Sequence, residues 1–518
     1  MIAALGAVSP ASMGDAGLEV WIEGEDRPRP MLEREVSSIG DVFARMARRR
    51  IDTLAVHAAA LPAMGLPARV EVPRPGESRP RHPWLDCTFL DKPPSHSALS
   101  PAITSGDGKL EVLLGAYQDG AGDPFAGALD ARELRDALVI FRDAFAGRNR
   151  KRGWSFRQNA IYTGWSLMHA AWKEPRRAAS LPALDDVRLP ELEGVAPGAW
   201  QLEVPYGSWA PARELAEARP ARPWVHGWDV NAQRLAACAR IPLGIGGLEH
   251  RAGDDFDGRL PGYHLVTSVD HPYDGLIPAV FEPGWHTTPR VQMARQLDLH
   301  PKVAQSWVWT RYAQYLNPWY EQLRDARQSL MQLARVDDDP HWKRCAQLAL
   351  SALKQCYLQP LGRLRSSRLR DSASPYYRPA WYDTVIGQEL AREYLRLHEL
   401  AALDVPVFAV YFDTIICETS HFQEIPAPLT VSDQLGKYKQ LGLVSRPLAH
   451  AALYEGERSP DVGRLVKLLK ENAGATSPPP GDSAAPATHP TGTRAALGAA
   501  PAFSLSSHDR PVHGGYPG

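Results

Sequence analysis

Residues 405–418, VPVFAVYFDTIICE, have the strongest strand character in the chain. The stretch is rich in β-branched and aromatic residues, and apolar residues flank its one aspartate, Asp413, on both sides. An ionised carboxylate in so apolar a run is costly to bury unless a cation or strong hydrogen-bond donors face it. Two interpretations therefore stand. Either Asp413 and Thr414 form the water-exposed turn of a hairpin, or a rigid β-hairpin presents Asp413 as a metal ligand.

A second acid, Asp229, ends a short apolar segment that begins at Trp224 and is followed directly by a helical stretch at 232–239. Alone, an acid in this setting is most often a helix N-cap. Two strand-borne carboxylates brought together are what two-metal phosphoryl transfer requires, because the ions stabilise both the attacking and the leaving oxygens. Hard oxygen ligands favour Mg²⁺. The sequence thus predicts Asp229 and Asp413 as catalytic, metal-binding residues.

Two long helices are predicted between these acids, at 318–335 and 341–358, with the turn DDDP at 337–340 between them. Lys354 lies late in the second helix, where the default for a lysine is a solvated surface charge. Gly362 and a group of arginines follow it: Arg363, Arg365, Arg368 and Arg370. Because such cations supply most of the affinity for nucleic-acid backbones, Lys354 is a candidate phosphate ligand.

The order of acid, lysine-bearing helix and acid-bearing hairpin resembles the three palm and fingers motifs of family-B DNA polymerases. Residues 229–235 (DVNAQRL) resemble the first motif, usually Asp-x-x-Ser-Leu-Tyr-Pro. Residues 354–362 (KQCYLQPLG) keep the lysine and the final glycine of Lys-x-x-x-Asn-Ser-x-Tyr-Gly at the same spacing. Residues 411–415 (YFDTI) resemble Asp-Thr-Asp-Ser-Ile, with Asp413 on the second, metal-binding acid. The resemblance covers about 225–440, and the chain is also similar to polymerase-like proteins of actinobacterial plasmids and integrative elements.

The resemblance implies a DNA-binding protein of polymerase type with Mg²⁺-dependent nucleotidyl transfer in the replication of a mobile element or linear replicon. Its expected partners are DNA, nucleotides and replication proteins. Residues 436–439 (GKYK) look like the lysine-containing segment that family members place near the primer strand. The implied nucleotide-binding residues are Lys354, Arg234 and Gly362, and the implied nucleic-acid-binding residues are Lys437, Lys439, Arg363 and Arg365.

Several positions depart from the family pattern. Arg234 stands where the family has the tyrosine that senses the sugar, and Tyr411 replaces the first acid of the third motif; Leu358, Gln359 and Leu361 replace the Asn, Ser and Tyr of the second. An alternative register, with Asp413 on the first acid, would put Ile415 at the metal position and abolish ligation.

These replacements in the expected nucleotide pocket leave a second function open: an inactive pseudo-polymerase that binds nucleic acid as a replication accessory, telomere-associated or regulatory protein. A third alternative is an unrelated intracellular α/β protein with accidental motif matches.

The expected fold class is α+β. A polymerase-like palm with helical fingers is predicted over 196–473, after an N-terminal α/β domain over 1–195 and before a Pro-, Ala-, Ser- and Gly-rich tail over 474–518 that is expected to be disordered. The N-terminal part has strand character at 52–58 and 110–117, and a helix that Asp130 caps. It is expected to be exonuclease-like without that activity, since no strand offers an Asp-x-Glu pair.

The composition limits the classes of protein to which the chain can belong. The 518 residues carry a formal net charge of -1, which argues against a protein coated in basic surface but allows a local basic groove. The five cysteines are far apart and the histidines are scattered, so neither a disulfide framework nor a metal-spaced pair is expected. The first residues lack the pattern of a signal peptide, and no run of about 20 apolar residues predicts a membrane span. The cytoplasm is the expected location.

Overall fold

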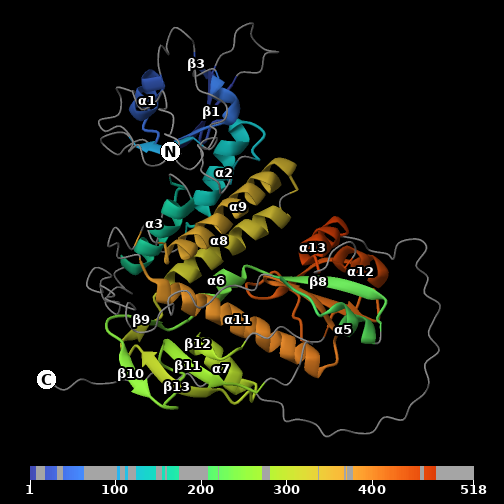
Figure 1. Cartoon of the computed structure of the whole chain (residues 1–518). Helices are drawn as coiled ribbons and strands as arrows, with labels where there is room; N and C mark the ends of the chain where they lie inside the picture. The colour runs from blue at the N-terminus through green and yellow to red at the C-terminus, as the bar shows by residue number, and fades with distance from the viewer. Residues whose placement is uncertain are drawn as a thin grey trace, which may run out of the picture. The chain divides into compact units, whose positions relative to one another are not determined.

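The computed structural model has an α+β fold, as expected (Figure 1). It describes residues 1–7, 18–31, 39–62, 102–104, 111–114, 124–125, 127–146, 154–157, 160–173, 208–219, 221–270, 281–336, 338–366, 369, 377–426, 428–454 and 460–473. The predicted tail at 474–518 lies outside this range, as do Arg368 and Arg370. None of the described helices is both long and apolar enough to cross a membrane.

The N-terminal part holds a six-stranded sheet in the order β3-β2-β1-β4-β6-β5. β1 (Ile2–Ala7) runs antiparallel to β2 (Leu18–Ile22) and parallel to β4 (Thr53–Val56); the remaining strands are β3 (Arg29–Met31), β5 (Ala102–Thr104) and β6 (Glu111–Leu114). Alternate residues of β1 enter two different cores, so α1 (Ile39–Arg48) covers one face and α2 (Ala131–Asp143) the other. The predicted strands are confirmed, and the described strands of this sheet contain no Asp-x-Glu pair.

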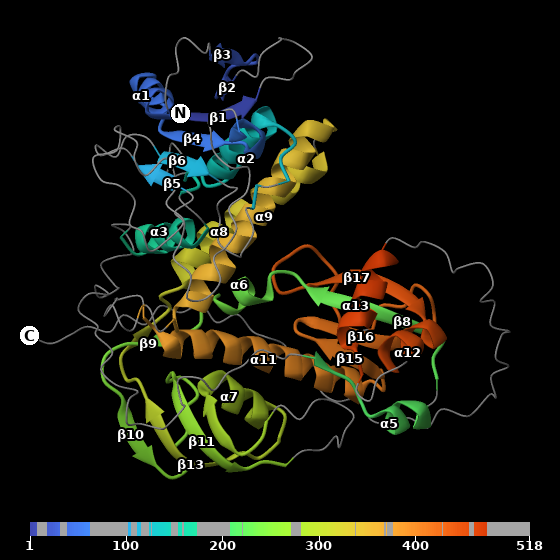
Figure 2. The same ribbon diagram turned by 45° about the horizontal axis from the view of Figure 1, so that its top comes forward.

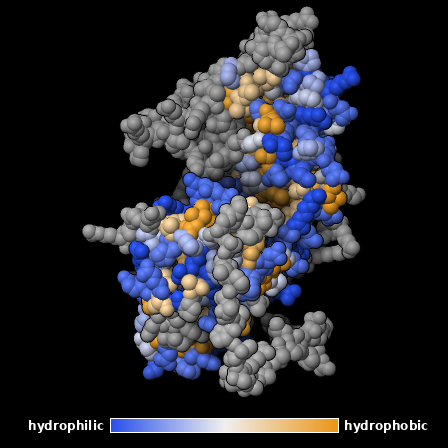
Figure 3. All heavy atoms as spheres, turned by 90° about the vertical axis from the view of Figure 1, so that its right-hand side faces the viewer, coloured by the Kyte–Doolittle hydropathy of each residue, from blue (hydrophilic) through white to orange (hydrophobic). Residues whose placement is uncertain are grey.

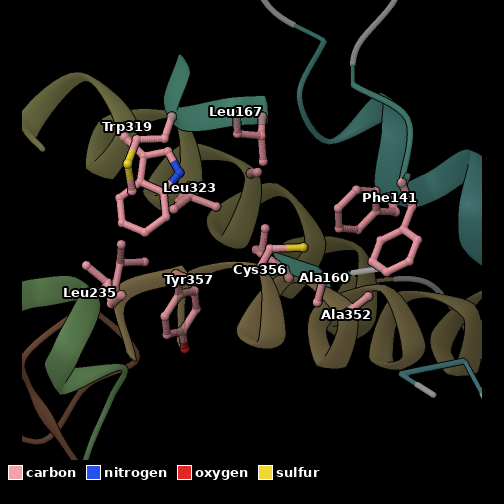
Figure 4. Close-up of a cluster of buried hydrophobic side chains, with 14 of the residues drawn as sticks. Phe141, Ala160, Leu167, Leu235, Trp319, Leu323, Ala352, Cys356 and Tyr357 are labelled. Atoms are coloured by element: carbon pink, nitrogen blue, oxygen red, sulfur yellow. The ribbon is translucent and has the colours of Figure 1, made fainter. Parts of the chain in front are cut away.

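The predicted cap of α2 is also confirmed, because the Asp130 carboxylate accepts a hydrogen bond of 2.8 Å from the Glu133 backbone N–H. α2 and α3 (Ala160–Lys173) pack on the two long predicted helices, α8 (Asn317–Val336) and α9 (Pro340–Arg363). Their shared core contains Phe141, Leu167, Trp319 and Cys356 (Figure 4). α9 runs past its predicted end at 358, through Pro360 and Gly362. The proposed division at 195/196 stays a prediction.

The approach of α3 to α9 depends on Gly164. A Cβ added there would lie 2.0 Å from the Cys356 carbonyl oxygen, whereas a Cβ at Gly362, on α9, would meet no heavy atom within 4 Å. We expect Gly164→Ala to lower the free energy of unfolding by at least about 3 kcal/mol, because two backbones must separate. Gly362→Ala should raise it by about 0.5–1 kcal/mol, the usual preference for Ala within a helix. Denaturant unfolding of both variants checks this; equal effects would contradict it.

The second part contains a five-stranded sheet in the order β17-β8-β16-β15-β7 (Figure 2). Its members are β7 (Ser208–Trp209), β8 (Trp224–Val230), β15 (Val407–Tyr411), β16 (Thr414–Thr419) and β17 (Tyr438–Ser445). α11 (Pro379–Ala402) packs on one face against Trp228 and Ile415. α12 (Arg446–Tyr454) and α13 (Val462–Glu471) pack on the other face against Val225 and Ile416. The stretch at 405–418 therefore forms the predicted hairpin at the centre of a sheet covered on both faces.

Between these elements the chain forms a four-stranded sheet in the order β10-β13-β11-β12, with α7 (Thr288–Gln296). The strands are β10 (Glu249–Ala252), β11 (Gly262–Ser268), β12 (Gly284–Thr287) and β13 (Lys302–Val308). Four short elements lie elsewhere in this part of the chain: α5 (Arg213–Ala218), α6 (Gln233–Ala237), β9 (Leu243–Gly244) and β14 (Tyr312–Ala313). On the face drawn in Figure 3, hydrophilic residues predominate and hydrophobic ones form small separate areas.

Candidate metal and nucleotide site

Asp229 and Asp413 lie on neighbouring segments of the sheet. β8 pairs antiparallel with β16, Thr414 faces Asp229 across the pair, and the Val230 N–H donates to the Asp413 carbonyl oxygen at 3.2 Å. Asp413 occupies a two-residue turn between Tyr411 and Thr414. It is thus a turn residue, as one interpretation holds, but it is half-buried beside Asp229. The expectation that the two acids converge is confirmed.

Asp229 is not a helix cap. α6 begins at Gln233, its N-cap position is Ala232, and that residue has a left-handed backbone with φ of 46°. The carboxylate is instead held across three strands, because Lys439 on β17 and Thr414 on β16 are its two direct cross-strand partners. The Lys439 Nζ lies 2.6 Å from Asp229 Oδ2, and the Thr414 hydroxyl donates to Asp229 Oδ1 at 3.2 Å. A row of cation, acid and hydroxyl therefore crosses the end of the sheet.

The Asp413 carboxyl is electrostatically disfavoured in its ionised form. Burial, and then the neighbouring Asp229 charge, raise its pKa to about 6, although the Lys354 ammonium opposes the shift. A divalent cation between the two carboxylates would remove this repulsion. Two carboxylates with adjacent open space are a donor set that suits Mg²⁺, which binds through one or two carboxylates and keeps waters or substrate phosphates in its other positions. The residues present therefore fit the predicted metal.

Two further acids come from α11, and the sequence interpretation missed them. Glu389 and Glu393 are both nearly fully buried, four residues apart on one helix face. Glu389 accepts a hydrogen bond of 3.0 Å from Arg234 Nε; burial raises its pKa to about 7, against the pull of Arg234. Glu393 accepts a bond of 3.4 Å from the Gln233 amide, its Oε1 has no hydrogen-bond partner among the described residues, and burial raises its pKa well above the ordinary value. The signal that could have found them is an acid pair at helical spacing within the apolar stripe of α11 that contains Ile386, Leu390 and Leu397.

These groups line one cavity of about 890 Å³. Asp229, Asp413, Glu389 and Glu393 form its acidic part, and the cationic side chains on its wall include Arg234, Arg327, Lys354, Lys439 and Lys470. The buried Tyr357 ring also reaches it, and burial raises the pKa of that phenol to about 12. A volume of this size is typical of sites for cofactors and other small ligands.

The structure brings together only some of the predicted site residues. Asp229, Asp413, Lys354, Arg234 and Lys439 line the cavity, whereas Gly362, Arg363, Arg365 and Lys437 do not. The Arg365 guanidinium lies 4.3 Å from the Tyr382 ring centroid, and the Lys437 carbonyl accepts a hydrogen bond of 2.8 Å from the Asn231 N–H. The roles assigned to these four residues stay predictions. Ile415, the metal position of the alternative register, is fully buried in the core beneath α11.

The face of the sheet that carries Asp229 is covered by α13. Gly227, two residues earlier on β8, faces the same side, and a Cβ there would lie 3.0 Å from the Leu469 side chain of α13. A Cβ at Gly442 on β17 would lie 1.8 Å from the Leu469 carbonyl oxygen. Because the helix backbone rests directly on the sheet, a ligand reaches the two acids through the cavity at the strand ends and not across the strands.

Neither a protein-family model nor a curated protein sequence matches the chain. Solved structures similar to it include Phi29 DNA polymerase with primer-template DNA, with 11% identity, a TM-score of 0.42, and coverage of 85% of this chain and 84% of that one. The ternary complex of that enzyme with incoming nucleotides gives 10% identity, a TM-score of 0.43 and the same coverage. The family B DNA polymerase of the hyperthermophilic archaeon Pyrobaculum calidifontis gives 12% identity and a TM-score of 0.29, over 81% of this chain and 53% of that one. These structures are DNA polymerases.

Proposed function

We propose that the chain is a polymerase-type nucleotidyltransferase that uses Mg²⁺ and acts on DNA. The observation that carries the proposal is the meeting of Asp229 and Asp413 at the end of one sheet, in a cavity that also presents Lys354. The two acids come from segments nearly two hundred residues apart, and each belongs to a different motif of the resemblance. Paired carboxylates beside cations suit phosphoryl transfer, which depends mainly on positioning and charge stabilisation.

The predicted site residues that line the cavity have distinct parts in this proposal. Asp229 and Asp413 would hold the metal, which supplies charge stabilisation for the transferring phosphoryl group. Lys354 would bind the triphosphate, and Lys439 would contact the primer backbone. Arg234, fixed by Glu389, would face the nucleotide where the family has its tyrosine. Four further roles are proposed on the motif resemblance alone: nucleotide binding for Gly362, and nucleic-acid binding for Arg363, Arg365 and Lys437. A function in the replication of a mobile element or linear replicon, with partner proteins, is proposed on the same resemblance.

A catalytically inactive nucleic-acid-binding protein is the second candidate, and two observations favour it. Lys439 already neutralises one oxygen of Asp229, and α13 covers the face of the sheet on which that acid lies. Leu358 and Leu361 point the same way, because they put apolar side chains where the second motif has Asn and Tyr, and Gln359 exchanges its Ser hydroxyl for a longer amide. Such a protein would retain a ligand site without the chemistry and would serve as a replication accessory, telomere-associated or regulatory protein.

Primer extension separates the two candidates. The full chain is incubated with primed template, deoxynucleoside triphosphates and Mg²⁺ or Mn²⁺, alongside Asp229→Ala and Asp413→Ala. Extension by the wild type that both variants lose supports the enzyme. DNA binding without extension, unchanged in both variants, supports the accessory protein. Neither extension nor DNA binding would overturn both.

Lys354 offers a narrower prediction. If it binds the triphosphate, Lys354→Ala should raise the KM for the nucleotide by roughly tenfold or more, since a lost charge-assisted hydrogen bond costs about 1.5–3 kcal/mol. Lys343→Ala is the control, because Lys343 is a lysine on the same helix, lies outside the cavity and has no role in the proposal. Steady-state kinetics with varied nucleotide concentration measure the change. Similar KM values for the two variants would contradict the assignment of Lys354 to triphosphate binding.

A further inference from the structure

A second group of potential metal ligands lies between α2 and α9, among residues that the proposed function does not use. Glu133 on α2 and His341 and Cys345 on α9 have ligand atoms that all lie within 4.8 Å of one another. Asp136, three residues along α2 from Glu133, adds a carboxylate oxygen 2.8 Å from His341 Nε2. We propose that Glu133, His341 and Cys345 bind Zn²⁺ between these two helices, with Asp136 beside them.

The spacing along each helix explains why the side chains meet. His341 and Cys345 are four residues apart and Glu133 and Asp136 are three apart, so each pair lies on one helix face, and α2 packs against α9. Neither a close pair of cysteines nor a spaced pair of histidines marks this set in the sequence, because its members are divided between two helices. A contact between segments about two hundred residues apart is visible only in the fold.

The distances suit zinc. Tetrahedral Zn²⁺ with a Zn–S bond of about 2.3 Å and a Zn–N bond of about 2.0 Å separates sulfur from nitrogen by about 3.5 Å. The Cys345 Sγ lies 3.7 Å from His341 Nε2, so this pair is already near that separation. A mixture of one thiolate, one imidazole and carboxylate oxygen is a ligand set typical of Zn²⁺, not of Mg²⁺. The Asp136 contact to Nε2 would have to yield to the metal.

The charged residues around the proposed ligands determine which of these ligands is protonated before the metal binds. Burial and the Asp136 charge raise the pKa of the Cys345 thiol to about 12, so without metal the thiol stays protonated. On zinc binding this proton would leave to solvent, the imidazole would bind in its neutral form, and no redox change occurs. The cations that face the acids are Arg344, which bonds both oxygens of Glu133, and Arg135 and Arg132 beside Asp136. The Leu129 N–H also bonds Glu133 Oε2, so Oε1, which among the described residues accepts only the 2.7 Å bond from Arg344 Nε, is the oxygen that would turn to the metal in exchange for that bond.

A metal here would join the helix that covers the N-terminal sheet to the long helix that carries Lys354. Glu133, Asp136 and Cys345 are nearly fully buried, whereas His341 is half-buried and gives access from solvent. The site does not include Asp229 or Asp413. It therefore stands or falls separately from the nucleotidyl-transfer proposal.

Cobalt substitution tests the proposal on the full chain. Metal-free protein is titrated with Co²⁺, and the near-ultraviolet absorption of thiolate-to-cobalt charge transfer is followed, with Zn²⁺ added last to displace the cobalt. We expect one Co²⁺ per chain with this band, and its displacement by Zn²⁺. Cys345→Ser should abolish the band, and His341→Ala should weaken binding by at least about a hundredfold, since even partners outside the ligand set change metal affinity 10- to 100-fold.

Two matched controls locate the signal. Cys356→Ala removes another buried cysteine of α9, and Cys87→Ser removes the cysteine that lies outside the described residues; both should keep the band. If the Cys345 variant does not fold, the wild-type spectrum still decides. Absence of the charge-transfer band at saturating Co²⁺ overturns the site, and so does a band that persists in Cys345→Ser or disappears in Cys87→Ser.

Discussion

Asp413→Asn is expected to lower the rate of Mg²⁺-dependent nucleotidyl transfer by about a thousandfold or more, while the protein remains folded. The variant keeps the size of the side chain and the backbone hydrogen bond from the Val230 N–H, so the hairpin geometry survives. It removes a carboxylate that the proposed Mg²⁺ requires. A bound metal stabilises transition-state charge by several kcal/mol, and about 4 kcal/mol corresponds to three powers of ten in rate.

Asp229→Asn should produce a loss of the same size, because both acids would hold the same ion. Asp433→Asn provides the control, since Asp433 also lines the cavity but is exposed and forms an ion pair with Arg335 on α8. Single-turnover extension at saturating nucleotide measures the chemical step directly, and circular dichroism checks the fold. A drop of less than tenfold in either Asp413→Asn or Asp229→Asn, with the control unchanged, would contradict the assignment of the metal site.

The same structure shows which features local sequence patterns can predict. The hairpin, β8 and the helices α8 and α9 follow from hydrophobic period and turn residues, which act over a few positions. The meeting of Asp229 and Asp413 does not follow from periodicity; it was expected because their order along the chain matched known motifs. Order along the chain thus predicted one long-range contact correctly.

Contacts that depend on strand register or on the packing of one helix against another were not predicted from the sequence. Lys439 meets Asp229 only because β17 pairs with β8 in a register that contains an irregularity between Gln440 and Gly442. Glu389 and Glu393 would be ordinary solvated acids on an isolated helix; α6 buries them by bringing Arg234 and Gln233 against α11.

The length of α9 explains why the glycine and arginines after Lys354 miss the cavity. The helix continues through Pro360 to Arg363 and does not end near 358. Gly362 lies eight residues beyond Lys354, and at about 1.5 Å per residue this places it roughly 12 Å farther along the axis. A motif spacing carries residues to a common site only when the intervening backbone turns, and here it remains helical.

At about pH 8, Asp413→Asn is also expected to be more stable than the wild type, by roughly 2–3 kcal/mol. The pKa of Asp413 is about 6 in the folded protein, above its ordinary value of 3.8, because of burial and the Asp229 charge. The folded state therefore binds this proton more tightly than the unfolded state does. The contribution is favourable below about pH 4, declines as the pH rises through about 6, and is lost above it. Asparagine mimics the protonated acid at every pH and so avoids the loss.

The difference in the free energy of unfolding between variant and wild type isolates this effect from other titrating groups. The buried His226 and His264 titrate in the opposite sense, since burial lowers their pKa values to about 4 and about 3, but they are present in both proteins and cancel. Urea unfolding across the pH range should show the difference large at about pH 8 and near zero at about pH 4. Millimolar Mg²⁺ at the higher pH should stabilise the wild type and leave Asp413→Asn unchanged, because the ion takes the place of the proton between the two carboxylates. A stability difference that does not change with pH would mean that Asp413 does not repel Asp229. An equal response of both proteins to Mg²⁺ would mean that the two acids do not share a cation. The acid that the chemistry needs is thus expected to be one that the fold would be more stable without.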